Sequence, residues 1–310
     1  MSFRVADNVS RLGEVAEHKT SLELQMFNKA QNMIEEQNPN NSTETAILPM
    51  QCYVQCGDNL ELLKSQPNES VNMIYCDILY GTGRNFGDYQ DLKPIRSEIE
   101  SHYLPRLIEM KRVLKQNGCI YLQMDTRINH WMRILMDDVF GYENFQNELV
   151  WVYRTQGFSK NKWSEKHDVI LFYSKSKEFI FNLEAVRENE IGESTQKRWY
   201  KEIAEYGMIP TKKNGKIYWN SPYSPPRDWI NINALPQAHS ERNGYSTQKP
   251  KELISRFVLA STNEGDVVAD YYLGSGTTCE VALELCRNFI GCDINPRAIE
   301  ITKERIKRFF

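Results

Sequence analysis

Short apolar runs alternate with amphipathic stretches from about residue 50 to the end of the chain. The runs are rich in β-branched and aromatic residues and predict buried strands at 52–56, 71–76, 119–123, 148–153, 168–173, 267–270 and 289–293. The stretches between them predict helices at 59–64, 95–114, 129–140, 250–260 and 277–285, the second of them ending at an Asn117-Gly118 cap. This alternation is typical of an α/β fold, with a mostly parallel sheet and helices on both faces.

Two segments break the alternation. Residues 1–48 carry apolar positions at helical spacing over 8–37, followed by the polar linker 38–45, and predict an N-terminal helical extension. Residues 182–244 have weak periodicity and mix aromatic with basic residues, and Lys213-Asn214-Gly215-Lys216 predicts a hairpin within them. We therefore expect an inserted, irregular subdomain at 182–244 between the two halves of one core, 49–181 and 245–310.

The composition is ordinary for a water-soluble protein, with 41% hydrophobic and 25% charged residues among 310. No apolar run approaches the roughly 20 residues that cross a bilayer, and the N-terminus has no signal-peptide core. We therefore expect a cytoplasmic protein without a membrane partner. The seven cysteines form no CxxC pair and lack an accompanying histidine cluster, which argues against a metal site.

The stretch 267–278, Val-Val-Ala-Asp-Tyr-Tyr-Leu-Gly-Ser-Gly-Thr-Thr, combines a strand, a glycine turn and a helix start. Gly274 and Gly276 permit a tight turn and close approach of a ligand to the backbone, as in nucleotide-binding cradles. One helix later, the strand 289–293 ends in Asp293, where a ribose would bind. The turn matches neither GxGxxG nor GxxxxGK[ST], which disfavours a nicotinamide enzyme and a P-loop kinase. A purely structural glycine turn stays an alternative.

A second motif lies about two hundred residues upstream, where the strand 71–76 is followed by Asp77-Ile78-Leu79-Tyr80. In this order, and with the box Thr247-Gln248-Lys249-Pro250 before the cofactor stretch, the chain resembles the permuted β class of DNA amino-methyltransferases. The segments 147–151, 167–173 and 291–296 are similar to further motifs of that family. The resemblance covers residues 50–310 and implies a Rossmann-like methyltransferase core, with 182–244 as its target-recognition region.

The resemblance also implies the roles of individual residues and S-adenosylmethionine as methyl donor. Asp77 and the backbone carbonyl of Ile78 would accept the hydrogens of an exocyclic base amine, and Tyr80 would stack on the flipped base. The residues implied for the cofactor are Asp58, Thr247, Lys249, Asp270, Tyr272, Gly274, Gly276 and Asp293. Alternatives left open are a helix N-cap for Asp58, a surface charge for Lys249 and a turn position for Asp293.

Two departures from the family pattern bear on activity. The usual motif is Asp-Pro-Pro-Tyr, and Ile78 and Leu79 replace both prolines; Tyr272 stands where Phe is usual. Proline fixes φ and restrains the preceding residue, so each lost restraint costs about 0.4–1 kcal/mol of preorganisation. We expect activity to be retained or impaired. The alternative from another functional class is a catalytically silent relic that binds DNA or serves as the specificity partner of another subunit.

The net charge of −3 argues against a uniformly basic nucleic-acid-binding protein, but basic residues cluster in two regions. We expect double-stranded DNA to contact Arg154, Lys160, Lys162, Lys166, Lys212, Lys213 and Arg227. The expected reaction is site-specific methylation of adenine N6, with N4 of cytosine as the alternative base. A homodimer and the cognate restriction subunit of a restriction-modification system are the candidate protein partners.

Overall fold

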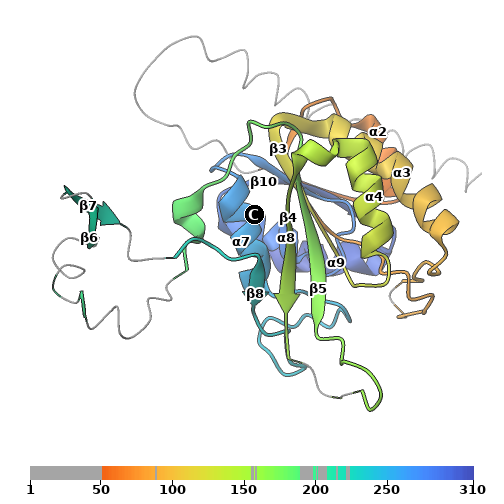
Figure 1. The fold of residues 1–310 in the computed structure, drawn as a ribbon. Coiled ribbons are helices and arrows are strands. Elements are labelled where there is room, and N and C mark those ends of the chain that lie inside the picture. Colours follow the sequence, from red (N-terminus) through yellow and green to blue (C-terminus); the bar gives the residue numbers. More distant parts are fainter. Residues whose placement is uncertain are drawn as a thin grey trace, which may run out of the picture. The chain divides into compact units, whose positions relative to one another are not determined.

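A sheet of eight strands organises the chain in the computed structural model (Figure 1). Its spatial order is β1 (Cys52–Cys56), β10 (Asn288–Asp293), β9 (Val267–Asp270), β2 (Val71–Asp77), β3 (Leu114–Met124), β5 (His167–Ser174), β4 (Phe145–Val152) and β8 (Trp229–Asn231). Neighbours pair in parallel except on the two sides of β5, which runs against the others in this sheet. The predicted mostly parallel α/β architecture is confirmed.

The structure describes residues 51–310 except 88, 155–156, 158, 189–197, 200, 202–207, 214–215 and 221–223. The helices predicted within 8–37 lie outside these residues. One compact unit spans Pro49–Phe310. Among the helices that the structure describes, none is long and apolar enough to cross a membrane.

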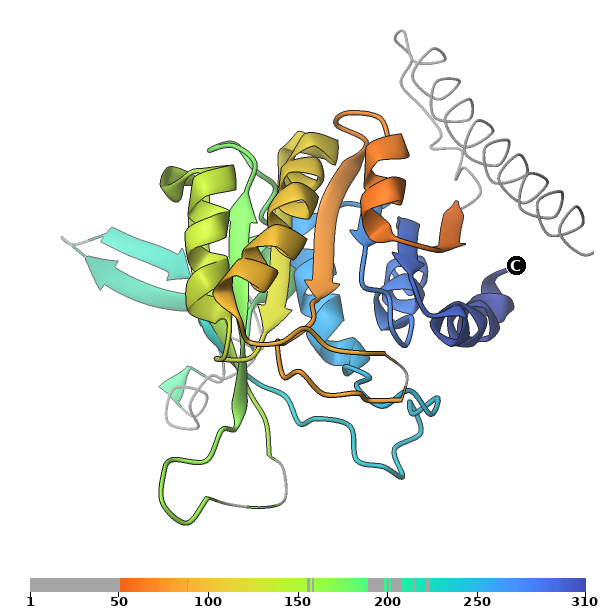
Figure 2. The same ribbon diagram turned by 90° about the vertical axis from the view of Figure 1, so that its right-hand side faces the viewer.

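Helices cover both faces of the sheet (Figure 2). One face carries α2 (Asn59–Ser65), α3 (Arg96–Val113) and α4 (Asn129–Phe140), and the other α7 (Lys251–Ser261), α8 (Thr277–Glu284) and α9 (Pro296–Ile306). Three short 3-10 helices complete the described helices, η1 (Tyr142–Asn144), η2 (Leu183–Val186) and η3 (Lys307–Phe309). Because both faces are covered, the central strands β2 and β9 are buried along almost their whole length, which explains their continuous apolar sequence.

Stacked aromatic rings join the central strands to α7. The ring of Tyr121 on β3 lies 4.3 Å from that of Phe172 on β5 and 4.8 Å from that of Phe257 on α7. Tyr75 on β2 stacks on the same Phe257 ring at 5.8 Å. Such rings bury a large apolar area, so this cluster fixes β2, β3 and β5 below the edge where the site lies.

The chain connections diverge between β2 and β9. From β2 the chain passes through α3 to β3 on one side, whereas from β9 it passes through α8 to β10 on the other. In an open parallel sheet, a divergence of this kind leaves a crevice beyond the carboxyl ends of the two strands. The sheet order therefore places the ends of β2 and β9 at a ligand-binding position.

The helix predicted at 95–114 is present as α3, but its predicted Asn117-Gly118 cap is wrong. We expected the helix from residue 95 to end at an Asn117-Gly118 cap, but α3 ends at Val113 and β3 begins at the next residue. The glycine serves strand pairing, because a Cβ on Gly118 would lie 2.7 Å from the backbone oxygen of Asn72. Close backbone approach between neighbouring strands, and not helix capping, is what requires glycine here.

The insert 182–244 contains more regular structure than expected. The predicted hairpin is present, with β6 (Ile209–Lys213) and β7 (Lys216–Asn220) forming a separate antiparallel pair in which Lys213 faces Lys216. The unexpected element is β8, which joins the main sheet beside β4 through the pairs Val150–Trp229 to Val152–Asn231. A strand of three residues carries too little periodicity to be recognised in the sequence.

Candidate active site

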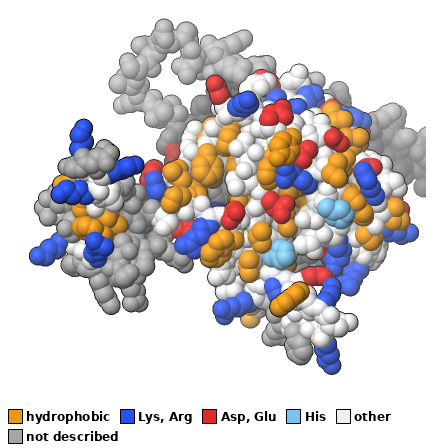
Figure 3. Space-filling view, in the orientation of Figure 1, with side chains coloured by type: hydrophobic (Ala, Val, Ile, Leu, Met, Phe, Trp, Pro, Cys, Tyr) orange, Lys and Arg blue, Asp and Glu red, His pale blue; other side chains and the backbone are white. Residues whose placement is uncertain are grey.

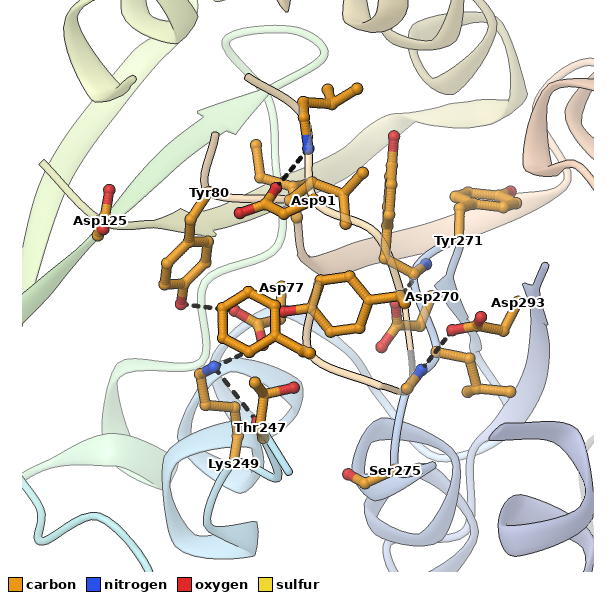
Figure 4. Close-up of a pocket in the computed structure, with 18 of the residues that line it drawn as sticks. Asp77, Tyr80, Asp91, Asp125, Thr247, Lys249, Asp270, Tyr271, Ser275 and Asp293 are labelled. Atoms are coloured by element: carbon orange, nitrogen blue, oxygen red, sulfur yellow. Dashed lines mark hydrogen bonds and ion pairs between the residues drawn. The ribbon is translucent and has the colours of Figure 1, made fainter. Parts of the chain in front are cut away.

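Five aspartates lie at the carboxyl ends of five parallel strands and line one cavity of about 850 Å³, and Figure 4 labels four of them, Asp77, Asp125, Asp270 and Asp293. They are Asp58 after β1, Asp293 on β10, Asp270 on β9, Asp77 on β2 and Asp125 after β3. The volume lies within the roughly 300–1,000 Å³ that is usual for small-molecule sites. Among its described lining residues, eight carboxylates oppose four lysine or arginine side chains, so the cavity favours a cation.

The β9–α8 turn requires glycine at two positions, for a different structural reason at each. Gly274 has a φ of 51°, its N–H donates to Asp293 Oδ2 at 2.8 Å, and an added Cβ would lie 3.3 Å from the ring of Tyr245 at the cavity wall. Gly276 has a φ of 72°, but its Cβ would overlap the side chain of Thr302 on α9. Gly274 thus borders the cavity, whereas Gly276 allows α9 to pack against the turn.

Burial dominates the electrostatics of the two aspartates beside this turn. It raises the pKa of Asp270 to about 7, even though Thr278 Oγ1 and the Tyr272 N–H donate to this carboxylate at 2.6 and 3.0 Å. Burial also raises the pKa of Asp293, which accepts from the backbone N–H groups of Asn295 and Gly274. Asp293 therefore ties the strand end of β10 to the glycine turn, in addition to any contact with a ligand.

Asp58 caps α2, as the alternative interpretation held. Its Oδ1 accepts from the Leu60 N–H at 2.8 Å and pairs with the Arg106 guanidinium at 2.8 Å. The side chain is still 47% exposed, so its second oxygen can take a ligand donor as well. One helical turn before Arg106, His102 Nε2 lies 2.9 Å from the Tyr272 hydroxyl, and burial lowers the pKa of that histidine to about 4.

Each oxygen of the Asp77 carboxylate has a partner. Lys249 Nζ lies 2.5 Å from Oδ2 and the Tyr80 hydroxyl lies 2.7 Å from Oδ1 (Figure 4). Thr247 lines the same cavity. Burial raises the pKa of Asp77, against the opposing charge of Lys249. The structure thus brings the Asp77–Tyr80 motif and the Thr247-Lys249 box together across 172 residues of chain, and Lys249 is not merely a surface charge.

The Tyr80 hydroxyl also contacts a second buried carboxylate. It lies 2.7 Å from Asp168 Oδ2, and Asp168 further accepts from Gln123 and Tyr153 at 2.9 and 2.8 Å. A phenol has one hydrogen, so the Tyr80 hydroxyl donates to one of the two carboxylates at a time or shares its hydrogen between them.

The expected DNA-binding residues fall in three places. Arg154, Lys160, Lys162 and Lys166 lie on the loop from β4 to β5, and Glu165 on this loop and His167 at the start of β5 line the cavity. Lys212 and Lys213 lie on the separate β6–β7 hairpin, and Arg227 precedes β8 and pairs with Glu188 at 3.4 Å. Figure 3 shows Lys and Arg side chains both at the end of the molecule where the loop projects and on the hairpin.

Sequence reasoning missed several residues that hold the site together. They are Asp91, Tyr103, Arg106, Gln123 and Asp168. Asp168 had a weak signal, since it is an acid at the start of an apolar strand that becomes buried. Tyr103 bonds the backbone of Leu79, within the Asp77–Tyr80 motif, and Asp91 bonds the backbone of Gly81 and Thr82 just after it, and such contacts leave no local pattern in a sequence.

This fold and site define a class of protein: a Rossmann-like sheet with one reversed strand, whose switch point carries a glycine turn beside an aspartate at the end of the neighbouring strand, is the architecture of α/β methyltransferases. The family profile described as DNA methylase matches residues 71–304, well over half of the chain. The chain therefore belongs to the N6/N4 DNA methylase family, and the resemblance stated from its motifs is confirmed.

Relatives of known activity cover most of this chain. M.HpaI, a type II methyltransferase of Haemophilus parainfluenzae, is 33% identical over 259 residues, which cover 82% of this chain and 74% of the relative. The DNA adenine methyltransferase YhdJ of Escherichia coli strain K12 is 30% identical over 254 residues, which cover 81% of each chain.

Solved structures share the fold at lower identity. The cytosine-N4-specific PvuII DNA methyltransferase has a TM-score of 0.58 at 17% identity, covering 82% of this chain and 86% of the other. A DNA modification methylase of Thermus thermophilus, TTHA0409, complexed with S-adenosyl-L-methionine, has a TM-score of 0.52 at 17% identity, covering 83% and 93%.

Proposed function

We propose that the protein transfers a methyl group from S-adenosylmethionine to the exocyclic N6 of adenine in duplex DNA, as the modification enzyme of a restriction-modification system. The observation that carries this proposal is the placement of Asp77 and the Gly274 turn after neighbouring strands, β2 and β9, on one cavity. A methyl donor held at the turn and an amine held at Asp77 would meet at short range. Membership of the DNA methylase family supports the same reaction.

The cavity suits S-adenosylmethionine, which supplies an electrophilic methyl group on a positively charged sulfur when bound. The excess of carboxylates favours this cation, and the bare backbone at Gly274 leaves room for it beside Tyr245. The residues proposed to hold it are Asp58, Thr247, Lys249, Asp270, Tyr272, Gly274 and Asp293. Gly276 contributes by packing the turn against α9.

Asp77 is proposed to accept a hydrogen bond from the exocyclic amine. The lone pair of this nitrogen is delocalised into the base, so acceptors that draw its hydrogens make it more nucleophilic. Asp77 performs this role only when ionised, and the nearby Lys249 ammonium favours the ionised form. The backbone carbonyl of Ile78 is the second proposed acceptor.

Tyr80 is proposed to stack on the base once it has left the helix. In the structure its hydroxyl is held between Asp77 and Asp168, so the ring has a defined position before DNA binds. A carboxylate oxygen offers two lone pairs, and Asp77 Oδ1 can therefore accept from the amine while it keeps Tyr80.

Two sets of observations bear on the choice of base. The relative YhdJ is named as an adenine methyltransferase and is 30% identical over 81% of this chain, which favours adenine N6. The cytosine-specific PvuII enzyme shares the fold at 17% identity, too distant to carry a substrate. N4 of cytosine stays the second candidate, because the amino-pyrimidine presents the same kind of amine to Asp77.

The loop from β4 to β5 and the insert 182–244 are proposed to bind DNA and read its sequence. The loop adjoins the cavity through Glu165 and His167, and its Trp163 side chain is 96% exposed, free to stack on a base. Residues 1–48 are proposed as a separate helical extension. A homodimer, a cognate restriction subunit and a cytoplasmic location complete the proposal.

The test is tritiated-methyl transfer from S-adenosylmethionine to mixed-sequence duplex DNA, followed by mass spectrometry of the nucleosides. We expect N6-methyladenine, and we expect Asp77→Ala to abolish it while DNA affinity changes only a few-fold, because phosphate contacts lie elsewhere. N4-methylcytosine without methyladenine would replace the proposed base. No transfer by the parent protein, with DNA and cofactor still bound, would favour a binding-only role.

A further inference from the structure

The altered catalytic motif is held by a backbone hydrogen bond that a proline cannot make. The Ile78 N–H donates to the carbonyl oxygen of Gln123 at 3.1 Å. This bond continues the β2–β3 pairing one residue beyond the Asp77–Gln123 partners, and the Ile78 side chain is 3% exposed. Proline has no N–H, so the usual motif ends the pairing at the aspartate. Ile78 therefore lengthens the rigid strand into the motif.

A tyrosine hydroxyl holds the next residue. Tyr103 lies on α3, is 1% exposed and donates to the carbonyl oxygen of Leu79 at 2.9 Å. Its ring meets the His102 ring edge-on at 4.7 Å, which fixes the hydroxyl in position. A buried donor on a helix thus determines where the peptide between Leu79 and Tyr80 lies.

The far side of Tyr80 is anchored as well. The Asp91 carboxylate accepts from the N–H groups of Gly81 and Thr82 at 3.1 and 2.7 Å, and this side chain is 3% exposed. The segment from Ile78 to Thr82 is therefore restrained on both sides of Tyr80. Each bond of this kind is worth about a two- to tenfold change in population, a range that includes the effect of one proline ring.

We propose that the Ile78 N–H bond and the Tyr103 hydroxyl replace the two missing prolines, so that Asp-Ile-Leu-Tyr is a competent catalytic motif and Tyr103 is a positioning residue. This inference rests on the proposed methyl transfer. Tyr103 acts through the Leu79 carbonyl and touches neither base nor cofactor. Its removal should therefore lower the rate of transfer and leave the binding of both substrates nearly unchanged.

The first test compares two buried tyrosines in steady-state methyl transfer. Tyr103→Phe should lower kcat about tenfold and change KM for S-adenosylmethionine and DNA by less than twofold. Tyr121→Phe is the matched control, because Tyr121 is also 1% exposed and its hydroxyl pairs with Ser261 away from the cavity. It should keep kcat within twofold of the parent. Equal losses in the two variants would overturn the proposal.

The second test restores proline. Leu79→Pro in the Tyr103→Phe background should recover most of the lost kcat, because the ring fixes φ and restrains Ile78 in place of the hydroxyl. In the parent, Ile78→Pro with Leu79→Pro should change kcat by less than threefold. A gain of tenfold or more there would show a damaged motif and overturn the inference while supporting the enzyme class.

If no protein in the series transfers methyl groups, the proposed methyl transfer fails, but the anchoring role of Tyr103 can still be tested. Amide hydrogen exchange provides this separate test. Exchange over 78–82 should be slow in the parent, faster by about tenfold in Tyr103→Phe and unchanged in Tyr121→Phe. Equal protection in all three would overturn the anchoring role of Tyr103, whatever the activity.

Discussion

At the residue scale, burial and one ion pair have opposite effects on the pKa of Asp77. Burial raises the pKa of Asp77, whereas the Lys249 charge and the Tyr80 hydroxyl lower it. Lys249 is 12% exposed in its side chain, and the pair is therefore little screened by solvent. The protonation state of the proposed amine acceptor thus depends on a lysine far away in the sequence.

Replacing this lysine should shift the pH dependence of catalysis. Asp77 accepts from the amine only when ionised, so the single-turnover rate should fall as the pH drops through its pKa. Without the Lys249 charge that pKa rises further, and the acid limb of Lys249→Met should move to higher pH. Rates measured between about pH 5 and 9 test this. Lys251→Met, which loses surface pairs with Glu280 and Glu284, should keep the parent profile.

Asp270 should make stability depend on pH. Burial raises its pKa in the folded protein to about 7, above the unfolded value near 3.9. The folded state therefore binds the extra proton between these values, and stability should fall as the pH rises from about 4 to about 7, by at most about 4 kcal/mol. Asp270→Asn should flatten this fall in urea unfolding measured at several pH values.

Part of the slope should survive in Asp270→Asn, because burial also raises the pKa of Asp77 and Asp293. The exposed Glu264→Gln is the control and should leave the slope unchanged. A slope in Asp270→Asn equal to that of the parent would mean that Asp270 is ionised in the folded protein at neutral pH.

At the element scale, the β9–α8 turn is set by two contacts at its glycines. Gly274 brings the backbone past the Tyr245 ring, and Gly276 brings it against α9 at Thr302. Both residues have positive φ, where a side chain is strained. The turn thus joins the cofactor cavity to the packing of α8 and α9.

Gly274→Val should abolish the binding of S-adenosylmethionine. The branched side chain would strain a residue at φ 51° and fill space beside Tyr245 at the cavity wall. Isothermal titration calorimetry on the folded variant, verified by circular dichroism, measures the loss. Gly87→Val, on an exposed loop where a Cβ meets no atom within 4 Å, also has positive φ and should bind the cofactor within a few-fold of the parent. Normal binding by Gly274→Val would place the cofactor elsewhere.

At the scale of the whole molecule, a net charge of −3 coexists with a DNA-binding assignment because the charges are separated. Carboxylates gather in the cavity, where a cationic methyl donor suits them, and lysines and arginines lie on the loop from β4 to β5 and on the hairpin. The average charge therefore says little about either ligand.

Lys160→Ala with Lys162→Ala should weaken DNA binding equally for all sequences. Two lost phosphate contacts reduce the slope of log K against log salt by about one to two. We expect the lower value, because Lys162 is paired with Glu165 and its charge is already partly neutralised. Titrations at several salt concentrations measure the slope. Lys303→Ala with Lys307→Ala, at the end of α9, is the matched control. An unchanged slope would exclude this loop from the DNA contact.

The sequence by itself determined the parts of the protein that depend on local pattern. Hydrophobic periodicity predicted all the central strands and the helices between them, because burial on both faces requires continuous apolar runs. Acids and glycines directly after these runs predicted the cavity at the carboxyl edge, because parallel strands bring their ends together. Gly274 and Asp293 follow from this rule, whereas the roles of Asp77 and Asp270 came from the family resemblance of the motifs.

The tertiary structure decided what depends on contacts between distant residues. The sheet order placed Lys249 on Asp77, Tyr80 between two carboxylates and Tyr103 on the Leu79 carbonyl. Tertiary contacts also pair β8 with β4 and bring the backbone of Asn72 close to Gly118. The physical reason is that a hydrogen bond or a close backbone approach needs only one suitable atom on each partner. Such a contact imposes no periodicity on the sequence, whereas burial of a strand or a helix face does.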